Sequence, residues 1–319
     1  MAYGQSGHLA INFQDSFGTS NADSAHFVPL ISESIAETVN QITEENMYAR
    51  LAESPLREGT HEIGGDIRTE AHPIALGALL KASLGAVSTT PQDSAFLHEF
   101  LPVGSDWDDF AALPPMTLDI HRDAGSAFLY YDVLGSALAL EIAHGNLLAA
   151  SLSVVGGRFA QKGPGTPGFP AGKPWGWEVV SASYDGAGIA DLRQISLTFD
   201  NQLASQFTLS AENVPRRIKR EGPQTVQVEG TILFVDQTLF QEFRAQSEKR
   251  LLLTFAGETI AQSYQNLLTL DFPRLRFSEF APQMAGPGQV EVGFRARGVF
   301  DTASGYALRV TLTNTQASY

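Results

Sequence analysis

The chain has 319 residues, of which 43% are hydrophobic and 18% charged, a composition that excludes wholesale disorder and suits two domains or one large β domain. It contains no cysteine, which excludes disulfides, thiolate metal sites and cysteine catalysis. The formal net charge of −14 disfavours binding to nucleic acid through phosphate neutralisation.

The excess negative charge lies entirely in the first half of the chain. Residues 1–160 carry 20 acidic and 6 basic side chains, whereas residues 161–319 carry 15 of each. Solubility explains an acidic surplus of this kind, and a specific role for the acidic half is the alternative.

The first 29 residues are polar with scattered aromatic side chains such as Phe13 and Phe27, and they predict an arm that crosses a surface or a neighbouring subunit. The beginning of the chain lacks the basic start and apolar core of a secretion signal, so we expect folding in a cytoplasm. The most apolar stretch, residues 127–155, is interrupted by polar residues, so we expect no insertion into a membrane.

The next segments predict a strand, a tip and a helix. Residues 30–42 mix a period of two with β-branched side chains and predict a strand, with a helix as the alternative. Residues 44–59 are charged and predict a long loop or a hairpin tip. A strand ending at Gly65-Asp66-Ile67 then leads into a helix from Pro73, whose apolar stripe consists of Leu76, Leu79, Leu80 and Leu84.

The remainder of the first half predicts a loop and then strands. Residues 87–115 contain four prolines and an acidic run, which is typical of a loop. Strands are expected at 116–123 and 128–133, and a hairpin at 137–143 and 148–155. Residues 160–174 are rich in proline and glycine and form a candidate linker; they match GxGxxG formally, but their prolines exclude the strand and helix which that motif requires.

The second half repeats the strand-then-helix unit. Gly230-Thr231-Ile232 leads to Asp236, a good N-cap, and then to Leu239, Phe240 and Phe243 on one helical face. The separation from Ile31 to Gly65 is 34 positions, and that from Ile195 to Gly230 is 35. The other strands expected in this half are 178–184, 193–199, 207–210, 226–234, 251–255, 267–272, 275–280, 290–300 and 306–312.

This layout predicts a mainly β protein with two tandem β-sandwich or barrel domains, each flanked by an α-helix. The repeated spacing indicates an internal duplication. The expected organisation is an arm at 1–29, a first domain at 30–159, a linker at 160–174 and a second domain at 175–319.

No catalytic motif is assembled in the sequence, and we expect no enzymatic activity, no cofactor and no metal. Asp119, His121 and Asp123 share one face of a predicted strand and could hold a metal, although solvated polar residues are far commoner at such positions. Asp106, Asp108 and Asp109 lack the glycine and glutamate of a calcium loop, so a solvated acidic loop is the simpler interpretation.

One basic cluster stands opposite an acidic loop in the repeat. Arg216, Arg217, Lys219 and Arg220 occupy the position in the second half that Glu44, Glu45, Glu53 and Glu58 occupy in the first. These two loops could pair between stacked copies and would then set register more than affinity. A solvated basic loop is the alternative.

Four stretches together resemble the major tail tube proteins of bacteriophages with long, flexible, non-contractile tails. They are Gly64-Gly65-Asp66-Ile67 with the helix ending at Leu84-Gly85; Leu113 to Leu118; Leu138 to Val155; and Leu270 to Leu275 continued through Gly286-Pro287-Gly288, Phe300-Asp301 and Thr311 to Thr315. The long acidic insertion at 87–115 departs from the family pattern.

The resemblance implies a structural virion protein whose inner sheets join into a ring-shaped barrel and whose rings stack into a tube. Two tandem domains imply a trimeric ring with pseudo-sixfold symmetry, with a hexamer as the alternative. The implied partners are further copies of the chain, the tape-measure protein and the terminator and tip proteins of the tail, assembled in the host cytoplasm.

A tube that conducts double-stranded DNA must not retain it, which an acidic lumen ensures. We therefore expect Asp119, Asp123 and Glu141 to face the lumen. The competing functions are a carbohydrate-binding or enzymatic β-sandwich, favoured by Trp107, Trp175 and Trp177, and an adhesin or decoration protein.

Overall fold

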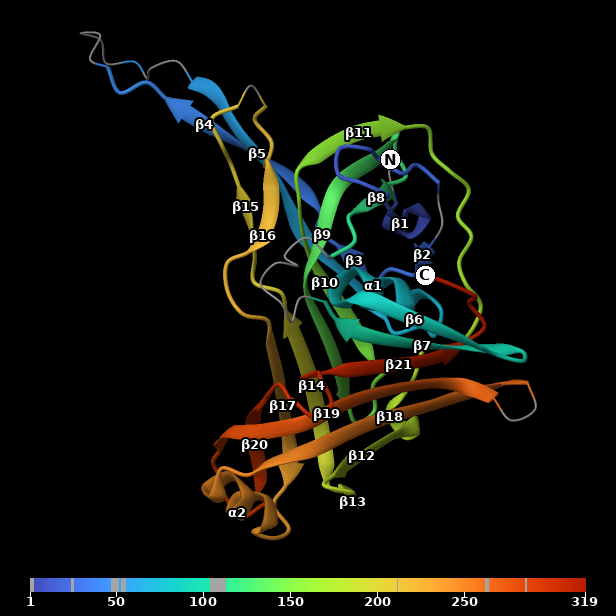
Figure 1. Cartoon of the computed structure of the whole chain (residues 1–319), viewed down its shortest axis with the longest axis vertical. Coiled ribbons are helices and arrows are strands. Elements are labelled where there is room, and N and C mark those ends of the chain that lie inside the picture. The colour runs from blue at the N-terminus through green and yellow to red at the C-terminus, as the bar shows by residue number, and fades with distance from the viewer. Residues whose placement is uncertain are drawn as a thin grey trace.

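The computed structural model describes residues 3–23, 26–46, 52, 56–103, 113–210, 212–261, 264–284 and 286–319. The mainly β prediction is confirmed (Figure 1). Two α-helices are described, α1 (Ala75–Leu84) and α2 (Thr238–Ala245), with 3-10 turns at Gly4–Ser6 and Trp177–Val179. Neither α-helix is long and apolar enough to cross a membrane, in a search confined to the described residues.

The strands of the first half are β1 (His8–Phe13), β2 (His26–Val28), β3 (Ser32–Glu33), β4 (Ala36–Thr43), β5 (Leu56–Glu70), β6 (Gly85–Gln92), β7 (Ala95–Pro102), β8 (Met116–His121), β9 (Ala127–Ala143), β10 (Ala149–Gly156) and β11 (Arg158–Lys162). Those of the second half are β12 (Val180–Tyr184), β13 (Ala187–Gly188), β14 (Leu192–Asp200), β15 (Leu203–Gln206), β16 (Arg217–Arg220), β17 (Thr225–Leu233), β18 (Glu248–Ala261), β19 (Tyr264–Phe280), β20 (Glu291–Gly298) and β21 (Arg309–Asn314).

A central sheet runs through both halves of the chain. Its order is β4–β5–β10–β9–β14–β17–β20–β19, and every neighbouring pair is antiparallel. The pairing of β9 with β14 joins the two halves over seven residue pairs, from Gln194 opposite Ala143 to Asp200 opposite Ala137. Figure 1 shows β9, β14 and β17 running close to the long axis of the molecule.

Two long strands leave the central sheet and continue into a second layer. Both β9 and β19 have 17 residues. The first part of β9 belongs to the order β2–β1–β8–β9–β11, and the first part of β19 to β6–β7–β21–β19–β18–β12–β13. One hydrophobic cluster fills the space beneath these layers with residues from both halves.

The two halves present the same arrangement of strands. β4–β5–β10–β9 in the first half corresponds to β14–β17–β20–β19 in the second, and an α-helix follows β5 and β17 alike. Gly65 and Gly230 lie at matching positions: an added Cβ would meet the Ser34 carbonyl oxygen at 2.5 Å in one case and the Gln194 carbonyl oxygen at 2.7 Å in the other. This match agrees with the predicted duplication, while the division into separate domains remains a prediction because both halves share one sheet.

The helices are confirmed, with shifted starts. α1 begins two residues after Pro73 and buries its leucine stripe completely, with Leu79 and Leu80 at 0% exposure. α2 has Gln237 as its N-cap, while the Asp236 carboxylate accepts a hydrogen bond from the Thr238 amide at 2.8 Å. α2 has no buried residue and packs its aromatic face at the edge of the core.

Two predictions of irregular structure or strand were wrong. Residues 85–102, expected to be mostly loop, form the β6–β7 hairpin, which β21 extends through its pairing with β7. Phe100 of this hairpin is fully buried, so its strand forms on a long-range contact that the nearby prolines concealed. Residues 207–210, expected to be a strand, are exposed and irregular, and the strand precedes them as β15. The acidic run at 106–109 lies outside the described residues.

The first segment of the chain is largely inside the fold. β1 lies between β2 and β8, and Leu9, Ala10 and Ile11 are all at 0% exposure. The expected surface arm is therefore wrong for the residues of β1 and β2. The apolar run is only a few residues long between polar flanks, so composition alone did not reveal a core strand.

Asn201 ties the two halves together at one end of β14. Its side-chain amide donates to the carbonyl oxygens of Ser83 (2.7 Å) and Gly135 (3.0 Å), and its Oδ1 accepts from Arg220 (2.9 Å) and Gln224 (3.2 Å). Asn201 itself is fully buried. A single side chain thus satisfies polar groups from both halves.

We expect Asn201→Ala to lower the free energy of unfolding by about 2–4 kcal/mol, because it leaves several buried polar groups without partners. Urea unfolding followed by tryptophan fluorescence measures this loss. Asn40→Ala is the matched control, because Asn40 is exposed and its side-chain amide donates to Thr60 Oγ1 at the surface; its effect should stay within about 0.5 kcal/mol. Equal losses for both variants would contradict the tying role of Asn201.

Candidate functional site: the polar face of the central sheet

The central sheet has one apolar and one polar face, as alternation along its strands requires. On β9 and β14 the residues Leu138, Leu140, Ile195, Leu197 and Phe199 are buried against the core. The residues between them point to the other side and are half-buried or exposed. Because β9 pairs with β14, this second face continues without a break from one half to the other.

Three rows of side chains cross this surface from β5 to β20 or β17, and together we call them the polar face. The acidic row is Glu70, Ala149, Glu141, Ser196, Glu229 and Arg295; the middle row is Arg68, Ser151, Ala139, Thr198, Gln227 and Arg297; the third row is Asp66, Ser153, Ala137, Asp200 and Thr225. The rows contain five carboxylates and three guanidinium groups, and their other side chains are small or neutral polar.

The carboxylates of the polar face are held in place by short hydrogen bonds. Gln194 Nε2 donates to Glu141 Oε1 at 2.8 Å, and Ser153 Oγ donates to Asp66 Oδ1 at 2.6 Å. The Arg295 guanidinium donates to Glu229 Oε1 at 2.6 Å, and the resulting ion pair raises the pKa of Arg295. The polar face therefore carries fixed charge of mainly negative sign.

Of the three residues predicted to face a lumen, Glu141 is exposed on the polar face. Asp119 lies elsewhere, with its carboxylate 1% exposed and 2.6 Å from Lys162 Nζ. Asp123 follows β8, where its carboxylate accepts a hydrogen bond from the Tyr3 amide at 2.8 Å. Polar and apolar side chains alternate along β8, but Asp119 is buried because its strand lies between β1 and β9 and its carboxylate pairs with Lys162.

Sequence reasoning did not identify the other carboxylates of the polar face, although the alternation of polar and apolar residues along the strands indicates which side faces solvent. Ser196 and Thr198 alternate with Ile195, Leu197 and Phe199, which identifies the solvent side of that strand. The missing information was the partner strand, since only the β9–β14 pairing brings Ser196 next to Glu141.

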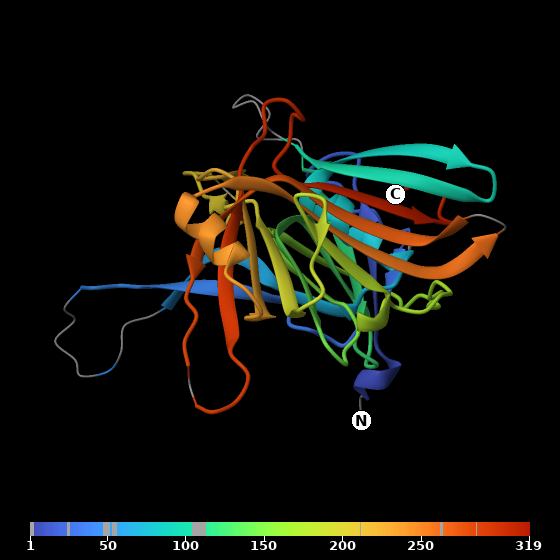
Figure 2. The same ribbon diagram turned by 90° about the horizontal axis from the view of Figure 1, so that it is seen from below.

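Two hairpins project together from one end of the molecule, β4–β5 and β15–β16 (Figure 1). Seen from below in Figure 2, the β4–β5 hairpin extends to the side opposite the β6–β7 and β18–β19 hairpins. The backbone amide of His61 on β5 donates to the Asn213 carbonyl oxygen at 2.7 Å, so the two hairpins are in contact within one chain.

The residues predicted to pair between stacked copies fall into two groups: some have partners within their own chain, and others are exposed. Arg220 is only 9% exposed and bonds to Asn201, and Glu44 pairs with Arg57 of its own hairpin at 2.9 Å. Glu58 accepts from His61, and Lys219 is half-buried. Glu45, Arg216 and Arg217 are exposed, and Glu53 lies outside the described residues.

A family model for phage tail tube protein matches residues 4–304, nearly the whole chain. The chain belongs to this family. It is thus a structural tail tube protein and a component of the virion. A search of curated proteins found no match.

The residues of this tail tube protein that suggested other chemistry have structural partners. In a search of the described ranges, no three His, Asp or Glu side chains are grouped so as to hold a metal ion. Trp175, which favoured sugar binding, is 2% exposed and its indole nitrogen donates to the Asn266 carbonyl oxygen at 3.3 Å. Trp177 is 42% exposed and contacts the His144 ring, while Trp107 lies outside the described residues.

His61 links the two strands of the β4–β5 hairpin through two carboxylates, one of which also contacts the β15–β16 hairpin. Its Nδ1 lies 2.7 Å from Glu37 Oε1 and its Nε2 lies 2.5 Å from Glu58 Oε1, which also accepts from Asn213 Nδ2 at 3.1 Å. The hydrogen bond to Glu37, supported by Glu58, raises the pKa of His61 above its ordinary value of 6.5. The protonated imidazole is therefore favoured in the folded hairpin.

A group whose pKa is raised by folding stabilises the fold most fully below its unfolded pKa, near 6.5, and loses this effect as the pH rises through the folded value. We expect His61→Gln to lower the melting temperature by about 1–2 °C at pH 6 and by less at pH 9. Calorimetry of both proteins across this range measures the difference. His144→Gln serves as the control. A loss of melting temperature in His61→Gln that does not depend on pH would contradict stabilisation by the protonated His61 between Glu37 and Glu58.

Proposed function

We propose that this tail tube protein polymerises into stacked rings whose bore conducts double-stranded DNA, with the polar face of the central sheet lining that bore. The observation that carries this proposal is the unbroken sheet across β9 and β14, which gives a single chain a continuous polar surface wide enough to be a wall segment. The polar face is free of large apolar side chains in its three rows, and the opposite face of the sheet is covered by the core.

The internal joint also indicates how a ring could close. β9 is the last strand of the first set of four, and it pairs with β14, the first strand of the second set. Among the described residues, β4 pairs only with β5, so its outer edge is open for the last strand of a neighbouring chain. A hollow of about 660 Å³, lined in part by Ala36, Phe128, Tyr130 and Phe159, lies beside this edge and leaves room for the neighbour.

Three chains joined in this way give six similar wall segments, a trimeric ring with pseudo-sixfold symmetry; a hexameric ring is the alternative. A heterologous contact that closes produces a ring, and stacking of rings produces the tube. The two tandem units correspond to residues 30–159 and 175–319, joined by the linker. The further partners would be the tape-measure protein within the bore and the terminator and tip proteins at its ends, with assembly in the host cytoplasm before the tube becomes part of the tail.

Cryo-electron microscopy of tubes assembled from the purified protein tests this proposal. We expect threefold-symmetric rings whose inner wall carries Glu70, Glu141 and Glu229. Sixfold rings would favour the hexamer, and protein that stays monomeric at millimolar concentration would contradict the conduit.

We expect Glu70→Lys/Glu141→Lys tubes to retain short double-stranded DNA in a nuclease-resistant form at low salt, because each phosphate contact adds salt-dependent affinity. Wild-type tubes should retain none, and retention by the variant should fall as salt rises. The matched control is Asp93→Lys/Glu258→Lys, which makes the same change of charge at exposed sites away from the polar face. DNA bound outside such control tubes stays accessible to nuclease, and equal protection in both variants would contradict a bore lined by the polar face.

A further inference from the structure

The ladder formed by β14 and β17 has two contrasting ends. At one end the chain passes into the β15–β16 hairpin, which extends the ladder outward beside β4–β5 (Figure 1). At the other end β17 leads to α2, and the β12–β13 turn lies next to it. Copies stacked head to tail along the strands therefore bring the hairpin of one copy to the α2 end of the next.

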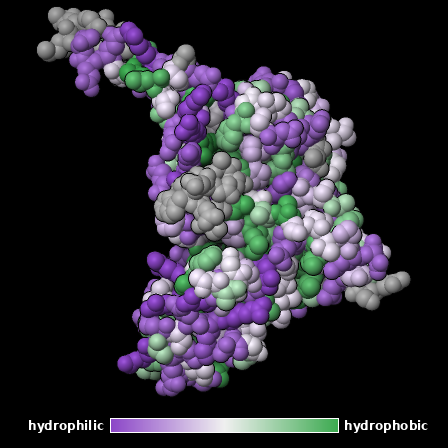
Figure 3. All heavy atoms as spheres, in the orientation of Figure 1, coloured by the Kyte–Doolittle hydropathy of each residue, from purple (hydrophilic) through white to green (hydrophobic). Residues whose placement is uncertain are grey.

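The α2 end contains a pocket of about 340 Å³ between α2, the β12–β13 turn and the end of β17. Ile189, Ile232, Leu239 and Phe280 supply much of its apolar lining, and Val235 at its edge is 70% exposed. The surface seen in Figure 3 is predominantly hydrophilic at this lower end of the molecule. An apolar hollow within a polar surface is the usual form of a docking site for a side chain.

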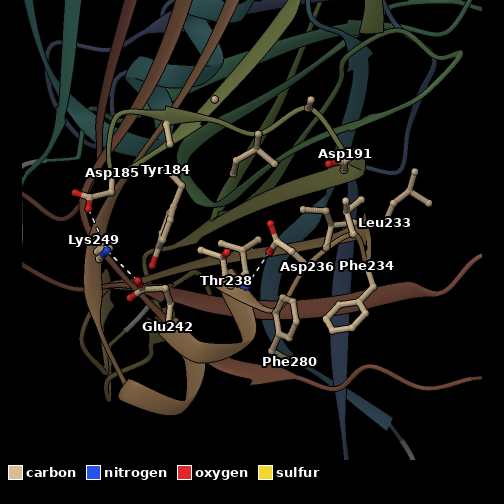
Figure 4. A pocket seen from close by; sticks show the side chains of 17 residues that line it. Tyr184, Asp185, Asp191, Leu233, Phe234, Asp236, Thr238, Glu242, Lys249 and Phe280 are labelled. Atoms are coloured by element: carbon tan, nitrogen blue, oxygen red, sulfur yellow. Dashed lines mark hydrogen bonds and ion pairs between the residues drawn. The ribbon is translucent and has the colours of Figure 1, made fainter.

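The charges around this pocket are strongly unequal (Figure 4). Its lining has the carboxylates of Asp185, Asp191, Asp236 and Glu242 against the single ammonium group of Lys249. Lys249 Nζ forms ion pairs with Glu242 Oε1 at 2.9 Å and with Asp185 Oδ2 at 3.1 Å. Among the described residues, no cation pairs with Asp191 or Asp236, although the Asp236 carboxylate accepts a hydrogen bond from the Thr238 amide. These two carboxylates at the pocket therefore have no cationic partner within the described part of the chain.

Tyr184 supplies an independent sign that the pocket lacks an occupant. This side chain is 7% exposed, and its hydroxyl has no hydrogen-bond partner among the described residues. The hydroxyl points toward the Glu242 and Lys249 pair in Figure 4. Burial, with the nearby Glu242 carboxylate, raises the pKa of Tyr184 to about 12, so the hydroxyl stays protonated and can donate to an incoming group.

The tip of the β15–β16 hairpin has the complementary chemistry. Leu209 is fully exposed at 109%, so its whole side chain is accessible to a partner. Arg216 and Arg217 are exposed at the base of the tip, and no ion pair joins either guanidinium to another described residue. The tip thus offers two exposed apolar side chains, Leu209 and Phe207, and two cations, while its carboxylate Glu212 is paired with Arg158 of the same chain.

We propose that the pocket beside α2 receives the β15–β16 tip of a second copy in the adjacent ring, with Leu209 entering the apolar hollow, Arg217 pairing with Asp191 and Arg216 pairing with Asp236. This inference rests on the proposed tube and specifies its axial contact. Both sequence-predicted loops project from the same end, so the basic loop faces this acidic pocket in head-to-tail stacking instead of facing the acidic loop. A single uncharged or symmetric contact would permit either polarity, whereas this contact permits one.

The first test uses single substitutions in the full chain. We expect Asp191→Arg, Arg217→Glu and Leu209→Asp each to raise the concentration needed for tube growth at least about tenfold, while rings still form. Turbidity and negative-stain microscopy measure tube growth, and circular dichroism checks the fold. Asp191→Arg could also fail because it disturbs the fold of the pocket. Leu209→Asp avoids this ambiguity, because Leu209 is fully exposed and its substitution leaves the core of its own chain unchanged.

The second test combines the two charge reversals in one chain. Asp191→Arg/Arg217→Glu restores opposite charges at every contact between copies, so we expect tube growth to return. Arg244→Glu on α2 is the matched control, because Arg244 is exposed and lies outside the pocket lining; its tubes should form as in the wild type.

The outcomes separate this inference from the proposed function. Normal tubes from the three single variants would overturn the docking contact and leave the conduit intact, as would failure of the double variant to recover. A wild-type protein that forms no tubes would overturn the proposed function and this contact together. Loss in each single variant with recovery in the double supports the axial contact.

Discussion

The hydrogen-bonded joint between β9 and β14 is the constraint on which the rest of the structure depends. It turns two similar halves into one sheet, and it therefore decides which side chains share a face. Glu141 lies beside Ser196 because the seven residue pairs of β9 and β14 hold this register, and the β14–β17 pairing then places Ser196 beside Glu229. A slip by one residue would move Ile195, Leu197 and Phe199 to the solvent side and expose the core. The buried Asn201 at the end of β14 opposes such a slip through its bonds to both halves.

The same joint separates the two directions in which the protein can associate. Across the strands, the chain shows how one set of four strands is placed beside the next, which supports lateral closure through the open edge of β4. Along the strands, the two ends of the β14–β17 ladder differ in chemistry, with cations and an exposed leucine at one end and uncompensated carboxylates around a hollow at the other. Lateral contacts would thus come from backbone pairing and axial contacts from side chains.

Local patterns predicted the elements, while long-range pairing decided their roles. The leucine stripe of α1, the hairpin of β9 and β10 and the matched glycines at 65 and 230 were readable because each depends on residues close in sequence or on a repeated spacing. The burial of Asp119 beside Lys162 was not predictable, because it depends on the contact with Lys162 on β11 and on the pairing of β8 with β1. The β6–β7 hairpin was concealed for the same reason, since β21 supplies its second neighbour from the far end of the chain. Glu141, which was predicted to face a lumen, is exposed on the polar face, but its neighbours on β14 could be identified only from the β9–β14 pairing.

The open edge of β4 has a consequence for the timing of assembly. A strand with an unpaired edge is ready to recruit any other strand, and a free subunit in a crowded cell is therefore at risk of uncontrolled growth. This edge carries Glu37, and the adjoining β5 carries Glu58 and Glu62, within the half of the chain that holds all the surplus acid. In the proposed tube, repulsion between these like charges would oppose the pairing of two β4 edges with each other, so that the edge stays open until the last strand of a neighbouring chain meets it.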